Sequence, residues 1–359
     1  MKKMITLGLA AVLAFTIAAC SSSTQTSGTN GGASNHPADH KQANGNANAN
    51  PTGTAAAWSP AKSIEVVVPA GAGGGWDTTA RMAAKVLEEQ NIIGQSMGAV
   101  NKAGGGGAVA WAGVHAKKGD NHTLFVTSPP IIFVHLNGQS QFSFRDFTPI
   151  ANLITDYGSF VARADAKWNN LNELFDDMKK DPAKITVVGA SAPGSMDHMQ
   201  FIKVAKAAGV DIRKIKYVSI QDGGALPALL NGSVDIYSTG IAESVEQVRA
   251  GKVKVLGITS EKRLSGDGIS EFKTAKEQGI DATFENWRGF FGPPGMDPNA
   301  LAYYEAKFKE LNTNSAWVEI RQKYGWNELF LTGEEYKAYL EKEEAALKQL
   351  LDELGLIKK

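Results

Sequence analysis

The sequence predicts an α/β fold with mostly parallel sheets and enough chain for two domains. Short apolar runs, which are typical of buried strands, alternate with stretches whose apolar residues recur at helical spacing. About 300 residues follow Pro60, which is sufficient for two domains. No internal repeat of fixed period is present.

The expected strands and helices alternate over most of the chain. Strands are expected at 64–68, 123–126, 185–188, 214–220, 234–238 and 253–259. Helices are expected through Met82, Val86 and Leu87, and then at 195–208, 226–232 and 244–251. After Pro298 the pattern predicts helices only. The last of these, 334–354, carries apolar residues at spacings of three, four and seven, as an amphipathic helix that docks on a core does.

The N-terminal residues have the features of a secretory signal. Lys2 and Lys3 precede an apolar run of roughly 15 residues, shorter than the about 20 that span a membrane. We therefore predict a signal peptide over 1–19. Residues 20–60 are rich in Ser, Thr, Gly, Asn and Ala, a composition that buries little apolar surface, so we predict a flexible linker. His36 and His40 within it are interpreted as solvated linker residues.

Composition excludes several kinds of site. Cys20 is the only cysteine, which excludes an intramolecular disulfide, a cysteine-based zinc site and a thiol catalyst. Without Lys2 and Lys3, the 37 basic residues become 35 against 37 acidic ones, and no basic block is present. We therefore expect no nucleic-acid partner. The histidines outside the linker show no metal-ligand spacing, so neither a metal nor a cofactor is expected; they are His115, His122, His135 and His198.

The first candidate site is the glycine-rich segment 69–79. Ligands of open parallel sheets bind beyond the C-terminal ends of strands, and this segment follows the first strand. Both nucleotide fingerprints fail, because Trp76 stands where G-x-G-x-x-G needs glycine and Trp76-Asp77-Thr78 replaces Gly-Lys-Ser/Thr. Backbone N–H groups at a helix start nevertheless hold anions well. A tight strand–helix turn without a ligand is the alternative.

Two side chains of this segment have two interpretations each. Asp77 is either the N-cap of a helix that begins at Thr78 or an acceptor for a ligand hydroxyl or a bridging water. Trp76 is either a pocket wall or part of a hydrophobic staple. The sequence leaves both questions open.

The second candidate site is the segment 188–199, again strand, small residues and helix. Ser191 and Ser195 supply hydroxyl donors, and Gly194 permits close approach of a ligand. Residues 189–193 nearly match the G-x-S-x-G nucleophile elbow, but Pro193 replaces the last glycine. No histidine lies beyond His198, which we expect to be a helix residue with a packing or hydrogen-bonding role. A secreted serine hydrolase that uses Ser191 is therefore a weak alternative.

Two further segments are of interest. Residues 101–108 form another glycine-rich turn from a strand into a helix. Residues 284–295 carry Trp287 and Arg288 before a Pro-Pro-Gly stop. Arg288 is suited to an ion pair with a ligand carboxylate or to bracing a domain crossing, and we favour the brace slightly.

An ordered set of motifs resembles a known family. "PAGAGGGWDTTAR", "NKAGGGGA", "GASAPGSMDHM", "DGGALPALLNG", "VRAGKVKVLGITSEKRL" and "ENWRGFFGPPGM" occur in this order. Together they resemble the substrate-binding proteins of tripartite tricarboxylate transporters (the Bug family) over Ala61–Lys359. The resemblance implies a two-domain Venus-flytrap fold of the periplasmic-binding-protein type, each domain a mostly parallel sheet flanked by helices. The expected domains are 61–163 plus 284–359, and 164–283.

The same resemblance implies a function without catalysis. "IAAC" resembles the lipobox of bacterial lipoproteins, so Cys20 would carry the lipid that anchors the protein to the outer face of the cell membrane. The protein would capture a small tricarboxylate or dicarboxylate such as citrate and deliver it to membrane permease subunits. A receptor for another small anion that feeds a sensor kinase is the alternative.

The ligand site implied by the family lies between the two loops, where backbone N–H groups and ordered water hold a carboxylate. The second loop is shorter here than in many relatives, which leaves the position of its donors open. The expected ligand-binding residues are Gly73, Gly74, Gly75, Trp76, Asp77, Thr78, Ser128, Ser191, Ala192, Gly194, Ser195, Asp197 and Arg288.

Overall fold

A single long strand, β4 (Thr148–Arg163), takes part in two sheet regions. In the computed structural model, which describes residues 58–221 and 223–358, the first part of β4 pairs antiparallel with β9 (Glu285–Gly292) and β10 (Asn327–Thr332). Its second part pairs antiparallel with β7 (Ile236–Gly240) and β8 (Val253–Ile258). We name these the first and the second sheet.

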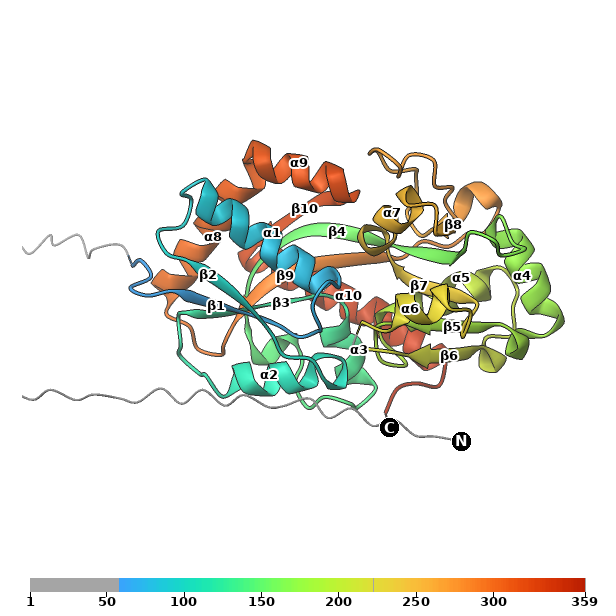
Figure 1. Ribbon diagram of the computed structural model, residues 1–359. Helices are drawn as coiled ribbons and strands as arrows, with labels where there is room; N and C mark the ends of the chain where they lie inside the picture. The colour runs from blue at the N-terminus through green and yellow to red at the C-terminus, as the bar shows by residue number, and fades with distance from the viewer. Residues whose placement is uncertain (1–57, 222, 359) are drawn as a thin grey trace, which may run out of the picture. The chain divides into compact units, whose positions relative to one another are not determined.

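The first sheet continues from β9 through three strands. β3 (Thr123–Thr127) pairs antiparallel with β9, and β1 (Ile64–Val68) lies between β3 and β2 (Met97–Asn101) with parallel pairing on both sides. Its position in the middle of the sheet explains why the run Ile-Glu-Val-Val-Val is almost wholly buried. The helices of this part are α1 (Gly75–Glu89), α2 (Ala108–His115), α3 (Pro130–Leu136), α8 (Pro298–Thr313), α9 (Ser315–Tyr324) and α10 (Gly333–Glu353) (Figure 1).

The second sheet is smaller. β5 (Thr186–Gly189) lies between β6 (Lys216–Ser219) and β7, parallel to both. The helices here are α4 (Leu171–Lys180), α5 (Met196–Ala207), α6 (Ala225–Leu230) and α7 (Ile241–Arg249), grouped on the right of Figure 1. Short 3-10 turns lie at Gly105–Gly107, Phe144–Asp146, Pro182–Lys184, Ile212–Lys214 and Lys276–Gln278.

The predicted α/β class is confirmed, and the pairing is mixed. β1, β2 and β3 form one parallel set, and β5, β6 and β7 form another, as the alternation of strands and helices predicts. The strands that join these sets, β4 and β9, run antiparallel to their neighbours. β4 carries the chain out of the first sheet and β9 carries it back, so these two strands run in opposite directions.

Four strands had no predicted range. β2 was implied only by the turn expected at 101–108, and β4 and β9 were not expected as strands. β10 lies in the region where helices only were predicted, so that prediction is wrong. The polar residues Asn152, Thr155 and Asp156 interrupt the apolar pattern of β4 although all three are buried. The expected helix at 244–251 also begins earlier, at Ile241, because Gly240 ends the preceding strand.

The C-terminal helix predicted at 334–354 is confirmed. α10 buries four residues that share one face, Tyr336, Leu340, Leu347 and Leu351. They pack in the same core cluster as Val67, Phe125 and Phe291 from the first sheet. Burial of such side chains stabilises a helix by roughly 1.5–3 kcal/mol each.

The described residues belong to one compact unit, assigned over Thr54–Lys359. Trp58 already packs on the core, with its ring 5.3 Å from Tyr303 and 5.8 Å from His122, so ordered packing starts slightly before the predicted end of the linker.

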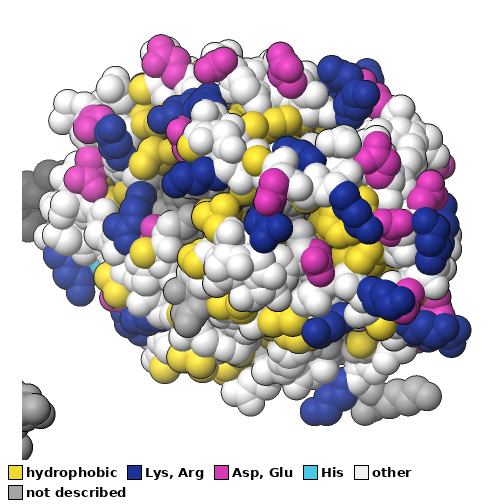
Figure 2. Space-filling view, turned by 45° about the vertical axis from the view of Figure 1, so that its right-hand side comes forward, with side chains coloured by type: hydrophobic (Ala, Val, Ile, Leu, Met, Phe, Trp, Pro, Cys, Tyr) yellow, Lys and Arg dark blue, Asp and Glu magenta, His cyan; other side chains and the backbone are white. Residues whose placement is uncertain are grey.

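The signal peptide, Cys20 and most of the linker lie outside the described residues. The division at 163 and 284 stays a prediction. Basic and acidic side chains are interspersed on the face shown in Figure 2.

Gly289→Ala should destabilise the fold, because β9 passes very close to its neighbours. A Cβ at Gly289 would meet the Tyr336 hydroxyl and lie 2.9 Å from the Ala151 carbonyl oxygen. We expect a loss of about 1–3 kcal/mol in the free energy of unfolding, measured by urea titration. Gly98→Ala in β2 is the matched control: a Cβ there meets nothing within 4 Å, so the change should stay within about 0.5 kcal/mol. Equal losses in both variants would contradict this packing.

Candidate ligand-binding site

A cavity of about 380 Å³ lies where several strands end and helices begin. Its walls come from the loops after β1, β2, β3, β5, β6 and β7 and from β9. Segments from both sheets therefore face one space, in the position where open α/β sheets bind ligands. The volume is in the range of small-molecule sites, which begins at roughly 300 Å³.

The loop after β1 is shaped by its glycines. Gly73 has a φ of 83°, which favours glycine, and Gly74 is the N-cap of α1 in an extended conformation. A Cβ on Gly75 would meet the guanidinium of Arg288 and lie 2.8 Å from Glu243 Oε1. Among the described residues, the N–H groups of Gly75 and Trp76 have no hydrogen-bond partner. This helix start therefore offers free main-chain donors beside the cavity.

Asp77 is not the N-cap that the sequence suggested. Because α1 begins at Gly75, Asp77 is the third residue of the helix, and its buried carboxylate reaches back into the loop. It accepts hydrogen bonds of 2.9 Å each from the Gly73 N–H, the Asn101 amide and the Arg81 guanidinium. Burial opposes its ionisation, but these donors together hold the pKa of Asp77 below its usual value. The Asp77 carboxylate is thus paired with groups of the protein itself.

Trp76 is fixed to the end of another strand. Its indole N–H donates to Ser128 Oγ at 2.9 Å, just beyond β3, and both residues line the cavity. The indole also packs beside the two core clusters of the first sheet. Trp76 is therefore a wall of the cavity. It is the second residue of α1 and occupies neither position of a hydrophobic staple, so that interpretation is wrong.

Two reciprocal hydrogen bonds between Ser191 and Asp197 close the loop after β5. The Ser191 N–H donates to Asp197 Oδ2 at 2.9 Å, and the Asp197 N–H donates to Ser191 Oγ at 2.8 Å. Gly194, with a φ of 78°, donates its N–H to His198 Nδ1 at 3.0 Å. His198 has the hydrogen-bonding role expected of it, and burial lowers its pKa to about 4.

Ser195 is the exception in this loop. It is the N-cap of α5, yet its side chain accepts no capping hydrogen bond, and its N–H donates to the Ala192 carbonyl oxygen. The hydroxyl is fully buried and has no partner among the described residues. Ser195 lines the cavity, and a hydroxyl buried there without a partner calls for an explanation.

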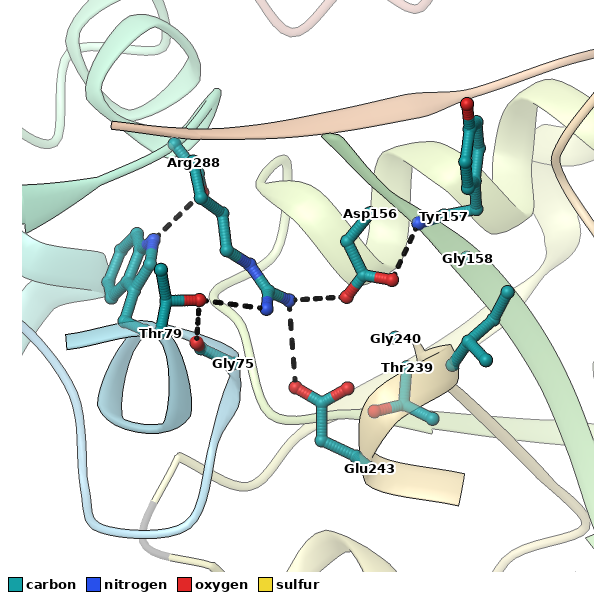
Figure 3. A network of polar contacts seen from close by, with 12 residues as sticks. Gly75, Thr79, Asp156, Tyr157, Gly158, Thr239, Gly240, Glu243 and Arg288 are labelled. Atoms are coloured by element: carbon teal, nitrogen blue, oxygen red, sulfur yellow. Dashed lines mark hydrogen bonds and ion pairs between the residues drawn. The ribbon is translucent and has the colours of Figure 1, made fainter. Parts of the chain in front are cut away.

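A buried ion pair includes Arg288, which lines the cavity (Figure 3). Arg288 Nη2 lies 2.7 Å from Asp156 Oδ2, and the side chains are 2% and 0% exposed. Arg288 Nη1 donates to Thr79 Oγ1 at 3.2 Å, and Nη2 lies 3.9 Å from Glu243 Oε1. Burial raises the pKa of Asp156 to about 7, with Arg288 opposing the shift and Glu243 adding to it. Arg288 thus braces β9 against β4 and α1.

The structure brings most of the predicted residues together. Nine of them line the cavity: Gly73, Gly74, Gly75, Trp76, Ser128, Ser191, Ser195, Asp197 and Arg288. Four others are near it without forming its lining: Asp77, Thr78, Ala192 and Gly194. Their contribution to ligand binding stays a prediction.

Sequence reasoning missed two loops and one buried acid. Gln221 and Gly223 follow β6, and Thr239, Gly240 and Glu243 follow β7. All of them line the cavity, so the rule applied to the first two loops would have found them. Asp156 is an acid inside an apolar strand, a signal of a buried charged partner. Asn286 on β9 also lines the cavity, and no pattern in the sequence around it indicates this.

Neither a metal cluster nor a membrane-spanning helix is found in the described part of the chain. Within 58–221 and 223–358, no group of three or more His, Cys, Asp or Glu residues is arranged to hold a metal ion. None of the helices in those ranges has the length and hydropathy to cross a bilayer.

Asp197→Asn should make folding stability less dependent on pH. Burial raises the pKa of Asp197 to about 7, with Glu243 acting in the same direction, against a usual value of 3.8. The contribution of this group is fully present below its unfolded pKa and is lost as pH rises through about 7. Asparagine keeps an acceptor for Ser191 and cannot ionise. In urea titrations, the variant should gain stability relative to the wild type from pH 4 to 8. A constant difference would contradict the raised pKa.

Comparisons with known proteins show which family the chain is similar to. The model of the tripartite tricarboxylate transporter family receptor matches residues 79–356. A UPF0065 protein of Bordetella pertussis is 30% identical over 274 residues, covering 75% of this chain and 83% of that protein.

Solved structures share the fold. The periplasmic binding protein BugD has a TM-score of 0.75 at 23% identity and covers 84% of this chain and 100% of its own. MatC from Rhodopseudomonas palustris, solved with bound malate, has a TM-score of 0.68 at 24% identity, covering 81% and 99%. These likenesses confirm the expected periplasmic-binding-protein fold. With the family match over 79–356, they show that the chain belongs to the tripartite tricarboxylate transporter family of receptors.

Proposed function

We propose that the protein is an extracytoplasmic receptor that captures a small carboxylate and delivers it to the membrane permease of a tripartite tricarboxylate transporter. It would bind the ligand between the two sheets and release it unchanged. The loops after β1 and β5 would close on it as the two halves of the fold approach each other.

The observation that carries this proposal is the shared cavity. The main-chain donors of Gly75 and Trp76 on one side and the Ser195 hydroxyl on the other belong to segments far apart in the sequence, and all three residues line one space. Hydrogen bonds to a charged group contribute about 1.5–3 kcal/mol each, so a few such donors suffice for a small anion. The malate held by MatC supports a small carboxylate as the ligand class.

We also propose that a lipid anchors the protein to the cell membrane. The predicted signal peptide and Cys20 would place the mature chain outside the cell membrane, held by a lipid on Cys20. The predicted linker would give the receptor reach toward its permease.

The contacts of Ser191 speak against the hydrolase alternative. Its Oγ accepts from the Asp197 N–H and lies 3.5 Å from the Tyr217 hydroxyl. His198 Nδ1 accepts from the Gly194 N–H, so it does not serve as a base for Ser191. A nucleophilic serine needs a base within hydrogen-bond reach. A receptor that feeds a sensor kinase would share the same cavity and differ only in its partner.

Calorimetric titration of the full chain with dicarboxylates and tricarboxylates tests the function. We expect saturable binding of at least one of them. Hydrolysis of ester substrates, or no heat from any carboxylate with folded protein, would contradict the proposal. Dependence of uptake on this chain in membrane vesicles that contain the permease would separate transport from sensing.

Ser195→Ala should weaken ligand binding and leave stability nearly unchanged. Its hydroxyl has no partner to lose, so a lost bond to a ligand carboxylate would lower affinity by about 10-fold or more. Ser191→Ala is the comparison: it removes the acceptor of the Asp197 N–H and should lower the free energy of unfolding by about 1 kcal/mol. Unchanged affinity in Ser195→Ala would remove that residue from the site.

A further inference from the structure

Three acids and one guanidinium lie at the cavity, and we call them the acid cluster. Asp156 comes from β4, Asp197 from α5, Glu243 from α7 and Arg288 from β9. If all four groups were ionised, the acid cluster would carry a net negative charge. Asp197, Glu243 and Arg288 line the cavity, so an anion bound there would bring further negative charge to these acids.

Two of the acids approach each other closely beside Gly240. A Cβ on Gly240 would lie 2.9 Å from Asp156 Oδ2 and would also meet Glu243 Oε2. Both acids share one nitrogen, because Arg288 Nη2 lies 2.7 Å from Asp156 Oδ2 and 3.9 Å from Glu243 Oε1 (Figure 3). Glu243 Oε2 is buried and has no hydrogen-bond partner among the described residues. One cation therefore compensates the two carboxylates only in part.

The other charged groups of the neighbouring elements are engaged elsewhere. Asp77 of α1 pairs with Arg81, and Arg321 of α9 pairs with Glu328. Lys254 of β8 donates to the loop before α4. In the part of the chain that the structure describes, a single guanidinium therefore pairs with the acid cluster.

The remaining titratable groups around the acid cluster are neutral near pH 7. Burial lowers the pKa of His198 to about 4. Burial, and after it the nearby acids, raise the pKa of Tyr157, Tyr217 and Tyr237 above the usual value of 10. These side chains neither compensate the acids nor add to their charge.

The acids themselves titrate close to neutral pH. Burial raises the pKa of Asp156 and of Asp197 to about 7, and Glu243 acts in the same direction on both. A negative charge brought into the cavity disfavours their ionised forms further. The bound state then holds more protons than the free state at the same pH.

We propose, on the basis of the proposed function, that the acid cluster takes up a proton from the solvent when a carboxylate enters the cavity. An O–H bond forms on one of the three acids, and no other bond is made or broken. The neutral carboxyl group is a hydrogen-bond donor, which a carboxylate is not. The receptor therefore captures its anion together with a proton and returns the proton when the anion leaves.

Calorimetry of the full chain at pH 8, in HEPES and in Tris, measures the proton uptake, because the two buffers differ in their heat of ionisation. The probes are malate, succinate, adipate and citrate, which are almost fully ionised at that pH. We expect at least about 0.3 proton taken up per bound carboxylate, so the dissociation constant should rise about 2-fold or more per pH unit above pH 7.

The outcomes separate this inference from the proposed function. Binding of a probe with an uptake below about 0.3 proton would overturn the inference and leave the proposed function intact. Binding of none of the four probes to folded protein would contradict the proposed function, and the inference with it.

Three variants locate the uptake. Glu243→Gln removes one acid at nearly constant size and should lower the uptake to less than half, because the ionised forms of Asp156 and Asp197 are then less opposed. Asp197→Asn should lower it as well. Glu246→Gln is the matched control, because it removes the same charge from α7 at an exposed residue paired with Arg249. It should keep the wild-type uptake.

Circular dichroism identifies the variants that fold. Wild-type uptake in folded Glu243→Gln or Asp197→Asn, or an equal loss in Glu246→Gln, would overturn the acid cluster as the place where the proton is held.

Discussion

The buried pair between Arg288 and Asp156 is the constraint on which the cavity depends. It holds β9 against β4 close to the point where β4 passes from the first sheet to the second. Removing one partner from such a pair typically costs about 3–5 kcal/mol, because the other charge stays buried. The guanidinium also lies so close to the start of α1 that only glycine fits at Gly75. The glycine-rich loop is thus explained by close approach as well as by free main-chain donors.

The loops after β1 and β5 are stabilised in the same way. Each leaves a strand, turns through a glycine with positive φ, and enters a helix whose early aspartate accepts a loop N–H. The aspartates therefore stabilise the turns. This resolves why acids lie beside a proposed anion site, and it sets Glu243 apart, since its carboxylate has no loop partner.

The sequence predicted the elements that carry a local signal. The parallel strands β1, β3 and β5 were found because short apolar runs end in turn residues, and both loops were found because they follow such strands. β4 was missed because Asn152, Thr155 and Asp156 are polar yet buried by pairing and by Arg288, which only the assembled fold supplies. The helix start at Gly75 was missed because Asp77 resembles an N-cap. Glu243 was missed because no glycine run marks its loop.

A crystal structure of the protein with a bound carboxylate is the most direct test of the central claim, that donors from both sheets hold one ligand. We predict carboxylate oxygens at about 3 Å from the Gly75 or Trp76 nitrogen and from Ser195 Oγ, inside the cavity. A ligand bound outside the cavity, or held by residues of one loop alone, would contradict it.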